Sequence, residues 1–245
     1  MSSETHSSEA PRVFPNTRWS VVLAARQDSP ESAAALEVLC QVYWYPLYAF
    51  VRRSGHSAED AEDLTQEFFC RLLEKHWLDS ANRDKGRLRT FLLVALRNFL
   101  RKEWRRVSAQ RRGRGLAAVQ MDTAFAESRL AADSHSLPPD ELFDRQWALT
   151  LLDLTVNRLR AETAAAGKPE DFEVLKGSLL ADRGSIDYGA VAKQLGVNEG
   201  AARVAVHRLR KRFRELYREE VSQTLAKGED LEGEVRHLAA ALARQ

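Results

Sequence analysis

The chain has 245 residues, and its 44% hydrophobic content is enough to bury a sizeable core. The 37 basic and 35 acidic residues nearly cancel, but each sign is concentrated in separate blocks. Cys40 and Cys70 lack the spacing of a zinc site or a disulfide framework, so we expect two buried thiols, a reducing compartment, no metal and no cofactor. No apolar stretch approaches the roughly 18 residues of a membrane span, and the N-terminus has no signal-peptide core. We therefore expect a cytoplasmic protein.

The spacing of apolar residues is helical along most of the chain and nowhere typical of strands. We predict an all-α fold of two small helical domains joined by a flexible linker. The boundaries follow changes in composition and the Pro138-Pro139 pair. The predicted segments are a disordered N-terminus (1–15), a first domain (16–106), a basic linker (107–139), a second domain (140–222) and a C-terminal extension (223–245).

The spacing of apolar residues over 57–77 predicts an amphipathic helix with Ser57 as its N-cap. Its apolar side would face the core, whereas the opposite side carries many carboxylates. Acids near a helix N-terminus can simply compensate the helix dipole on a solvated surface. They can also form a docking surface for a basic helix of a partner protein. The apolar side consists of Ala61, Leu64, Phe68 and Leu72, and the acidic side of Glu59, Glu62, Asp63, Gln66 and Glu67.

Residues 87–106 predict a second amphipathic helix, which is basic on its outer side. Between Arg97 and Arg114 there are eight basic residues and one acid. Cations beside aromatic rings are typical of surfaces that hold unpaired nucleotides, because phosphates pair with arginine and bases stack on rings. Phe91 and Trp104 are candidates for such stacking, although either could belong to the core instead.

Residues 187–216 predict two helices separated by a short turn. Asp187 and Asn198 are suitable N-caps, and Gly196 suits the turn. Between Glu199 and Arg218 there are seven basic residues and two acids. A helix of this kind either enters the major groove of DNA or is a solvated basic helix of another helical domain.

In this order, the three segments resemble the bacterial sigma factors of the extracytoplasmic-function group, which keep only sigma regions two and four. AEDLTQEFFCRLLEK and RTFLLVALRNFLRKEWRR resemble two runs of region two, and YGAVAKQLGVNEGAARVAVHRLRKRFREL resembles region four. The resemblance covers roughly residues 36–106 and 139–221. Phe91 stands where the family usually has tryptophan, and Glu103 lies near a usual aspartate position, which indicates a divergent subgroup.

The resemblance implies a role for each motif. The acidic helix would bind the clamp helices of the largest subunit of core RNA polymerase, through Asp60, Asp63, Gln66 and Glu67. The basic helix and the 82–86 loop would contact the minus-ten promoter element, through Asn82, Arg87, Arg89, Phe91, Arg97, Asn98, Arg101 and Arg105. The second helix of the last pair would read the minus-thirty-five element, through Asn198, Glu199, Arg203, His207, Arg208 and Arg210. An anti-sigma factor or another regulator is a further possible partner.

Two other functions are compatible with parts of the sequence. A helix-turn-helix regulator that does not bind core polymerase would explain the last helix pair but not the basic run from Arg97 to Arg114. A metal-dependent nuclease would use the carboxylates of residues 59–67. These lie along one helix without a converging histidine or second acidic segment, and the chain has no glycine-rich phosphate loop, so we expect no enzymatic activity.

Overall fold

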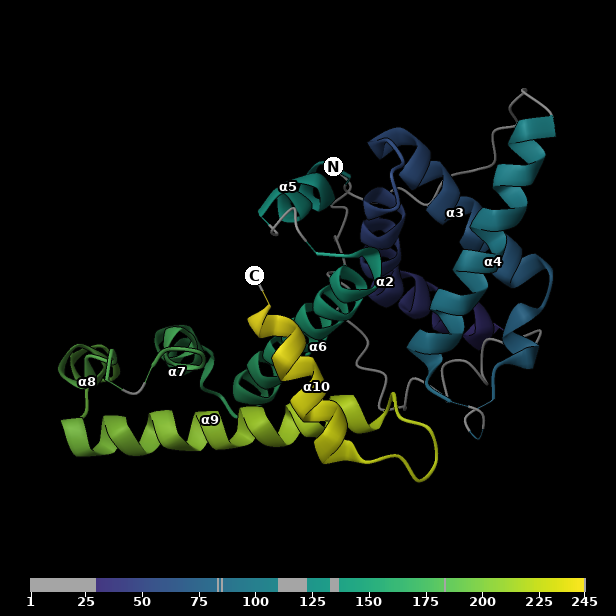
Figure 1. The fold of residues 1–245 in the computed structure, drawn as a ribbon. Helices are drawn as coiled ribbons and strands as arrows, with labels where there is room; N and C mark the ends of the chain where they lie inside the picture. Colours follow the sequence, from purple (N-terminus) through teal and green to yellow (C-terminus); the bar gives the residue numbers. More distant parts are fainter. Residues whose placement is uncertain are drawn as a thin grey trace, which may run out of the picture.

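A computed structural model describes residues 30–82, 84, 86–109, 123–132, 137–182 and 184–244. The predicted disordered N-terminus (1–15), much of the predicted linker and its arginines 111, 112 and 114 lie outside the described residues. The described residues form helices connected by turns, without strands, which confirms the predicted all-α class (Figure 1). The elements are α2 (Pro30–Arg53), α3 (Ala58–Glu74), η1 (Trp77–Ser80), α4 (Leu88–Ala109), α5 (Thr123–Ala132), α6 (Pro139–Ala165), α7 (Pro169–Leu175), η2 (Lys176–Ser178), α8 (Tyr188–Leu195), α9 (Glu199–Ser222) and α10 (Leu231–Ala243).

Local capping bonds fix three of the helix starts that the sequence predicts. The Ser57 hydroxyl accepts a hydrogen bond from the Asp60 amide at 3.0 Å and begins α3. The carboxylate of Asp187 and the side-chain oxygen of Asn198 do the same for α8 and α9, at 2.9 and 2.8 Å. Gly196 ends α8 with a φ of 66°, a left-handed conformation in which a side chain is disfavoured. Satisfied end groups hold both helices in the predicted register.

The larger hydrophobic core is built by α2, α3, α4 and the first half of α6. Phe68 of α3 lies 5.9 Å from Phe99 of α4, measured between ring centroids. Tyr43 of α2 stacks on Trp147 of α6, with centroids 4.6 Å apart and planes inclined by 12°. Val221 near the end of α9 and Leu238 of α10 are buried in the same core. Chain segments from both ends of the protein therefore share one apolar interior.

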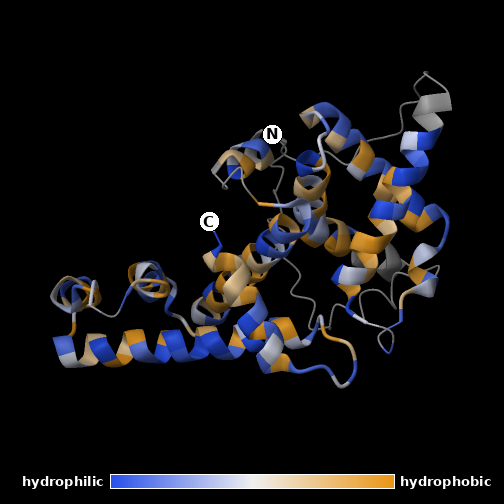
Figure 2. Cartoon of the chain, in the orientation of Figure 1, coloured by the Kyte–Doolittle hydropathy of each residue, from blue (hydrophilic) through white to orange (hydrophobic). Residues whose placement is uncertain are grey.

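The second core lies between the other half of α6, α7, α8 and the first part of α9. Phe172 and Leu216 are fully buried there, and Val206 and Phe213 of α9 face the same interior. In Figure 1, α7 and α8 lie along one side of α9, which extends away from the larger core. Figure 2 shows that hydrophilic residues predominate along α9, with apolar residues between them. Hydrophilic residues such as Arg203 and His207 are exposed. One face of α9 is packed, and its polar face is turned outward.

A short helix, α5, lies inside the segment predicted as linker and packs on α2. The Glu127 carboxylate accepts hydrogen bonds from Arg52 at 2.7 and 2.9 Å and from the Tyr48 hydroxyl. The Arg129 guanidinium lies 4.6 Å from the centroid of the Tyr45 ring. The predicted domain boundaries stay a prediction, and the structure adds that α6 belongs to both cores.

Cys40 and Cys70 are free thiols that are only half-buried, whereas buried thiols were expected. Burial raises the pKa of Cys40 to about 11, and the neighbouring Cys70 and Glu37 act in the same direction. A thiol of this kind is a weak nucleophile at neutral pH, because the thiolate is the reactive form. No helix among the described residues is long and apolar enough to cross a membrane.

Candidate protein and nucleic-acid interface

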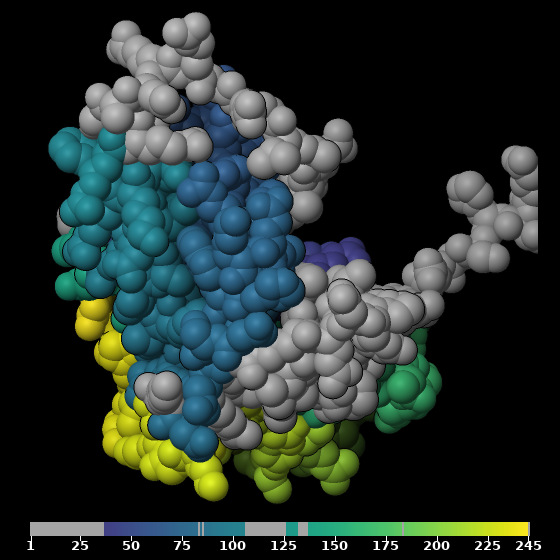
Figure 3. All heavy atoms as spheres, turned by 90° about the vertical axis from the view of Figure 1, so that its right-hand side faces the viewer, coloured from purple at the N-terminus to yellow at the C-terminus, as the bar shows by residue number. Residues whose placement is uncertain are grey.

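Helices α3 and α4 lie side by side on one face of the molecule (Figure 3). Arg71 of α3 links them, because it donates to the buried Glu103 of α4 at 2.5 Å and lies 5.2 Å from the Phe99 ring. This contact gives Glu103 a structural role at a position that the resemblance singled out as unusual. The Arg71–Glu103 ion pair thus holds the acidic helix α3 and the basic helix α4 in a fixed relative position.

The outer side of α3 carries the predicted polymerase-binding residues. Asp60 and Asp63 are exposed, and Asp60 also accepts a hydrogen bond from the Ser57 hydroxyl at 2.7 Å. Gln66 and Glu67 are half-buried, and Glu67 accepts a hydrogen bond from Arg71 at 2.8 Å. Asp63 is thus the most accessible carboxylate in the middle of the helix.

The outer side of α4 presents Asn98, Arg101 and Arg105, which are all exposed. Arg97 is different, because it pairs with Asp140 at the start of α6 and lies 5.5 Å from the centroid of the Phe50 ring. The structure therefore brings three of the predicted minus-ten residues onto one open surface. It engages Arg97, another of the predicted minus-ten residues, in a contact between α4 and α6.

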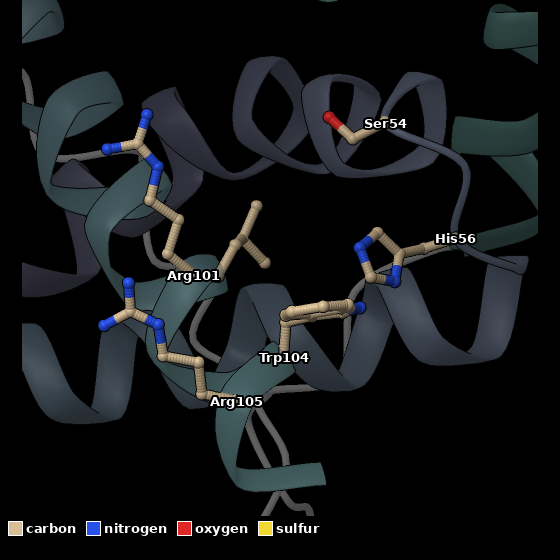
Figure 4. A pocket seen from close by; sticks show the side chains of 6 residues that line it. Ser54, His56, Arg101, Trp104 and Arg105 are labelled. Carbon is tan, nitrogen blue, oxygen red and sulfur yellow. The ribbon is translucent and has the colours of Figure 1, made fainter. Parts of the chain in front are cut away.

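Trp104 lies beside these arginines and is 73% exposed. Together with Leu100 and His56 it lines an open hollow of about 450 Å³, which Arg101, Arg105 and Ser54 complete. Figure 4 shows the indole ring between His56 on one side and the two arginines on the other. Of the two alternatives for this ring, core or stacking surface, the structure favours the second.

Phe91 and the 82–86 loop take other positions. Phe91 is half-buried and packs against the larger core, so it has little ring surface for a base. Asn82 is exposed, and its side-chain oxygen accepts a hydrogen bond from the Asp84 amide at 2.8 Å. Residues 83 and 85 of this loop lie outside the described residues.

Arg87 and Arg89, at the start of α4, are bound to the C-terminal part of the chain. Arg87 donates to both carboxylate oxygens of Glu229, at 2.9 and 3.0 Å, and to Glu234 at 2.5 Å. Arg89 is buried, donates to the other oxygen of Glu234 and lies 3.7 Å from the Asp144 carboxylate. These acidic partners could not be predicted from the sequence, since no local pattern connects them with α4.

The first half of α9 carries the predicted minus-thirty-five residues. Glu199, Arg203, His207 and Arg208 are exposed, and the Arg203 guanidinium lies 4.2 Å from the centroid of the Tyr188 ring of α8. The Asn198 side chain caps α9.

Arg210 faces the interior side of the same helix. It donates to the main-chain carbonyls of Ser178, at 2.7 Å, and Ala181. Arg210 therefore joins α9 to the segment that follows α7, whereas Arg203, His207 and Arg208 are exposed.

Residues 43–110 match the family model of Sigma-70 region 2. Searches of curated proteins and of solved structures found no match for this chain. The matched segment contains all of α3 and α4, and therefore both charged faces and the Trp104 hollow. It ends before α6, α8 and α9, so the match does not extend to the last helix pair. The chain therefore contains a segment that is similar to region 2 of the sigma-70 factors.

Proposed function

We propose that this protein is a sigma factor of the extracytoplasmic-function group, which binds core RNA polymerase and directs transcription initiation at specific promoters. The observation that carries the proposal is the match to region 2 over the segment that holds an acidic helix beside a basic one. Region 2 of this family binds core polymerase and promoter DNA, and the two faces suit these two partners.

Polymerase binding is assigned to α3. Asp60 and Asp63 offer exposed carboxylates to a basic helix of the largest subunit, and Gln66 and Glu67 lie on the same face. Charge complementarity of this kind speeds association and fixes the orientation of the partner. The ion pair of Glu67 with Arg71 holds the edge of the surface in place.

Minus-ten DNA is assigned to α4 and the Trp104 hollow. Arg101 and Arg105 would pair with phosphates, while the Trp104 ring would stack on an unpaired base. This division of work suits melted DNA, because unpaired bases expose their flat faces and their backbone remains charged. The hollow thus adds Trp104 to the residues that the resemblance implied.

Minus-thirty-five DNA is assigned to α8 and α9 as a helix-turn-helix unit. The support is the short turn at Gly196, the cap at Asn198 and the exposed row of Glu199, Arg203, His207 and Arg208. Such a row can reach base edges in a major groove while the apolar side of α9 remains packed.

We propose no catalytic role for the protein. Among the described residues, no cluster of His, Cys, Asp and Glu side chains is suited to hold a metal ion.

In vitro transcription tests the proposal. Purified protein is added to core RNA polymerase with a pool of genomic DNA fragments, and the transcripts are mapped. We expect new transcripts with defined start sites that require both the protein and core enzyme. Transcripts that do not change on addition of the protein, together with no complex with core polymerase, would contradict the proposal. Specific duplex binding without a polymerase complex would instead support the helix-turn-helix regulator.

A further inference from the structure

The C-terminal segment of residues 223–244 lies against the start of α4. In Figure 3 the C-terminal segment borders the lower edge of the face formed by α3 and α4. Glu229 and Glu234 both form ion pairs with Arg87, and Glu234 also pairs with Arg89. The side chain of Glu234 is 1% exposed and that of Arg89 is 6% exposed. Two of the cations assigned to promoter DNA are therefore paired with carboxylates of the same chain.

Contacts with α6 and with the larger core also hold the segment in place. Arg145 of α6 donates to the main-chain carbonyls of Leu242 and Arg244, at 2.6 and 2.7 Å, at the end of α10. His237 of α10 lies 3.1 Å from the Asp144 carboxylate of α6. Leu238 and Ala241 bury the apolar side of α10. These contacts place Glu234 opposite the two arginines.

The chemistry of this contact matches that of a nucleic-acid backbone. Arginine donates to a carboxylate through the same planar fork with which it donates to a phosphate. A buried ion pair contributes little net stability, because removing both charges from water offsets much of their attraction. Apolar side chains would therefore hold α10 at least as well. Ion pairs between two arginines and two glutamates instead suit a contact in which the arginines can exchange a carboxylate for a phosphate.

We propose that residues 223–244 act as an internal competitor for DNA phosphates: they occupy Arg87 and Arg89 in the free protein and release them when the DNA backbone binds. The inference rests on the proposed function, since it concerns regulation of the same minus-ten surface. Free protein then binds DNA weakly, and displacement of α10 opens the complete surface.

Binding of a short fluorescent single-stranded DNA oligonucleotide to the full-length protein tests the competition. Glu234→Gln keeps the size of the side chain and removes its charge, so we expect its affinity to rise about tenfold over the wild type. Glu232→Gln is the matched control. It removes the same charge from the same helix, but Glu232 pairs with the exposed Arg218. We expect the control to change affinity less than about twofold.

A second variant covers the possibility that Glu234→Gln does not fold. Arg145→Ala loosens the end of α10 without touching the α4 face, and circular dichroism checks its helix content. The variant loses a positive charge, which by itself weakens DNA binding. A rise in affinity therefore reports release of the segment and not a change in net charge.

Hydrogen exchange gives an independent readout. We expect the amides of residues 231–243 in the wild type to exchange faster when the oligonucleotide is added. Unchanged exchange, or equal affinities for the wild type, Arg145→Ala and Glu234→Gln, would overturn the competition. If no form binds the oligonucleotide but all bind core polymerase, the competition fails and polymerase binding stands. Failure of both kinds of binding would overturn the proposed function itself.

Discussion

Tyr43 and Trp147 stack face to face, 4.6 Å apart, although one belongs to the segment that matches Sigma-70 region 2 and the other lies beyond it. The contact puts α6 into the same core as α2. Both rings are buried, with Trp147 fully so. A single interior then couples the stability of the two parts of the chain.

Trp147→Ala should destabilise the whole protein. Removing a fully buried indole leaves a large cavity, and we expect a loss of about 3–5 kcal/mol in the free energy of unfolding. Urea unfolding followed by circular dichroism measures the loss. Trp104→Ala is the matched control, because it deletes the same side chain at a site that is 73% exposed. Equal losses for the two variants would contradict the role of the stack.

Asp63→Arg should abolish binding to core RNA polymerase without unfolding the protein. The change places a positive charge in the middle of the acidic side of α3, where the proposed partner helix is basic. Co-elution with core enzyme and circular dichroism measure the two effects. The control is Glu170→Arg, which makes the same charge reversal at an exposed position of α7. If Asp63→Arg still co-elutes with core enzyme as the control does, the assignment of polymerase binding to α3 is contradicted.

Trp104→Ala should weaken binding of single-stranded DNA to the complex with core polymerase. Loss of one stacked base corresponds to about 1–3 kcal/mol. Trp104→Phe keeps an aromatic face and should retain most of the affinity. Fluorescence anisotropy with an oligonucleotide distinguishes the two. Similar affinities for the alanine and phenylalanine variants would show that the ring does not stack on a base.

Arg203→Ala and Arg210→Ala should have different consequences, although the resemblance assigns both residues to the minus-thirty-five element. Arg203 is exposed on the outer side of α9, so its removal should change which duplex sequences are preferred. Arg210 binds two main-chain carbonyls, so its removal should lower the stability of the helix pair by about 1–3 kcal/mol. Selection from a random duplex library and thermal unfolding test the pair. The assignment is wrong if Arg210→Ala alters sequence preference at unchanged stability.

Glu127 should make stability depend on pH. Hydrogen bonds from Arg52, and less strongly from Tyr48, hold its pKa below the ordinary value of 4.5, although burial acts in the opposite direction. The stabilisation is therefore complete above about pH 5 and disappears as the pH falls through the lowered pKa. Glu127→Gln should cost about 1 kcal/mol at pH 7 and less at about pH 3. Urea unfolding at both pH values measures this. A cost that does not change with pH would contradict the ion pair.

The sequence predicted those features that depend on neighbouring residues. The caps at Ser57, Asp187 and Asn198, the turn at Gly196 and the apolar side of α9 all follow from contacts within a few positions. For the same reason the charged sides of α3 and α4 could be assigned before their arrangement was known.

Long-range contacts could not be predicted in this way. Arg89 and Glu234 are 145 positions apart, and no periodicity connects them. The exposure of Trp104 depends on which elements cover the end of α4, and the inward direction of Arg210 depends on the carbonyls near η2. Residue type and spacing indicate that such side chains are available, whereas the tertiary fold decides which partner they meet.

The length of α6 affects how one chain can reach two promoter elements. Its 27 residues span about 40 Å, and each of its halves is embedded in a different core. Elements centred near minus ten and minus thirty-five are separated by about 85 Å of duplex, at about 3.4 Å per base pair. Under the proposed function, α6 alone covers about half of the distance between the two elements, so the segments packed at its two ends must cover the rest.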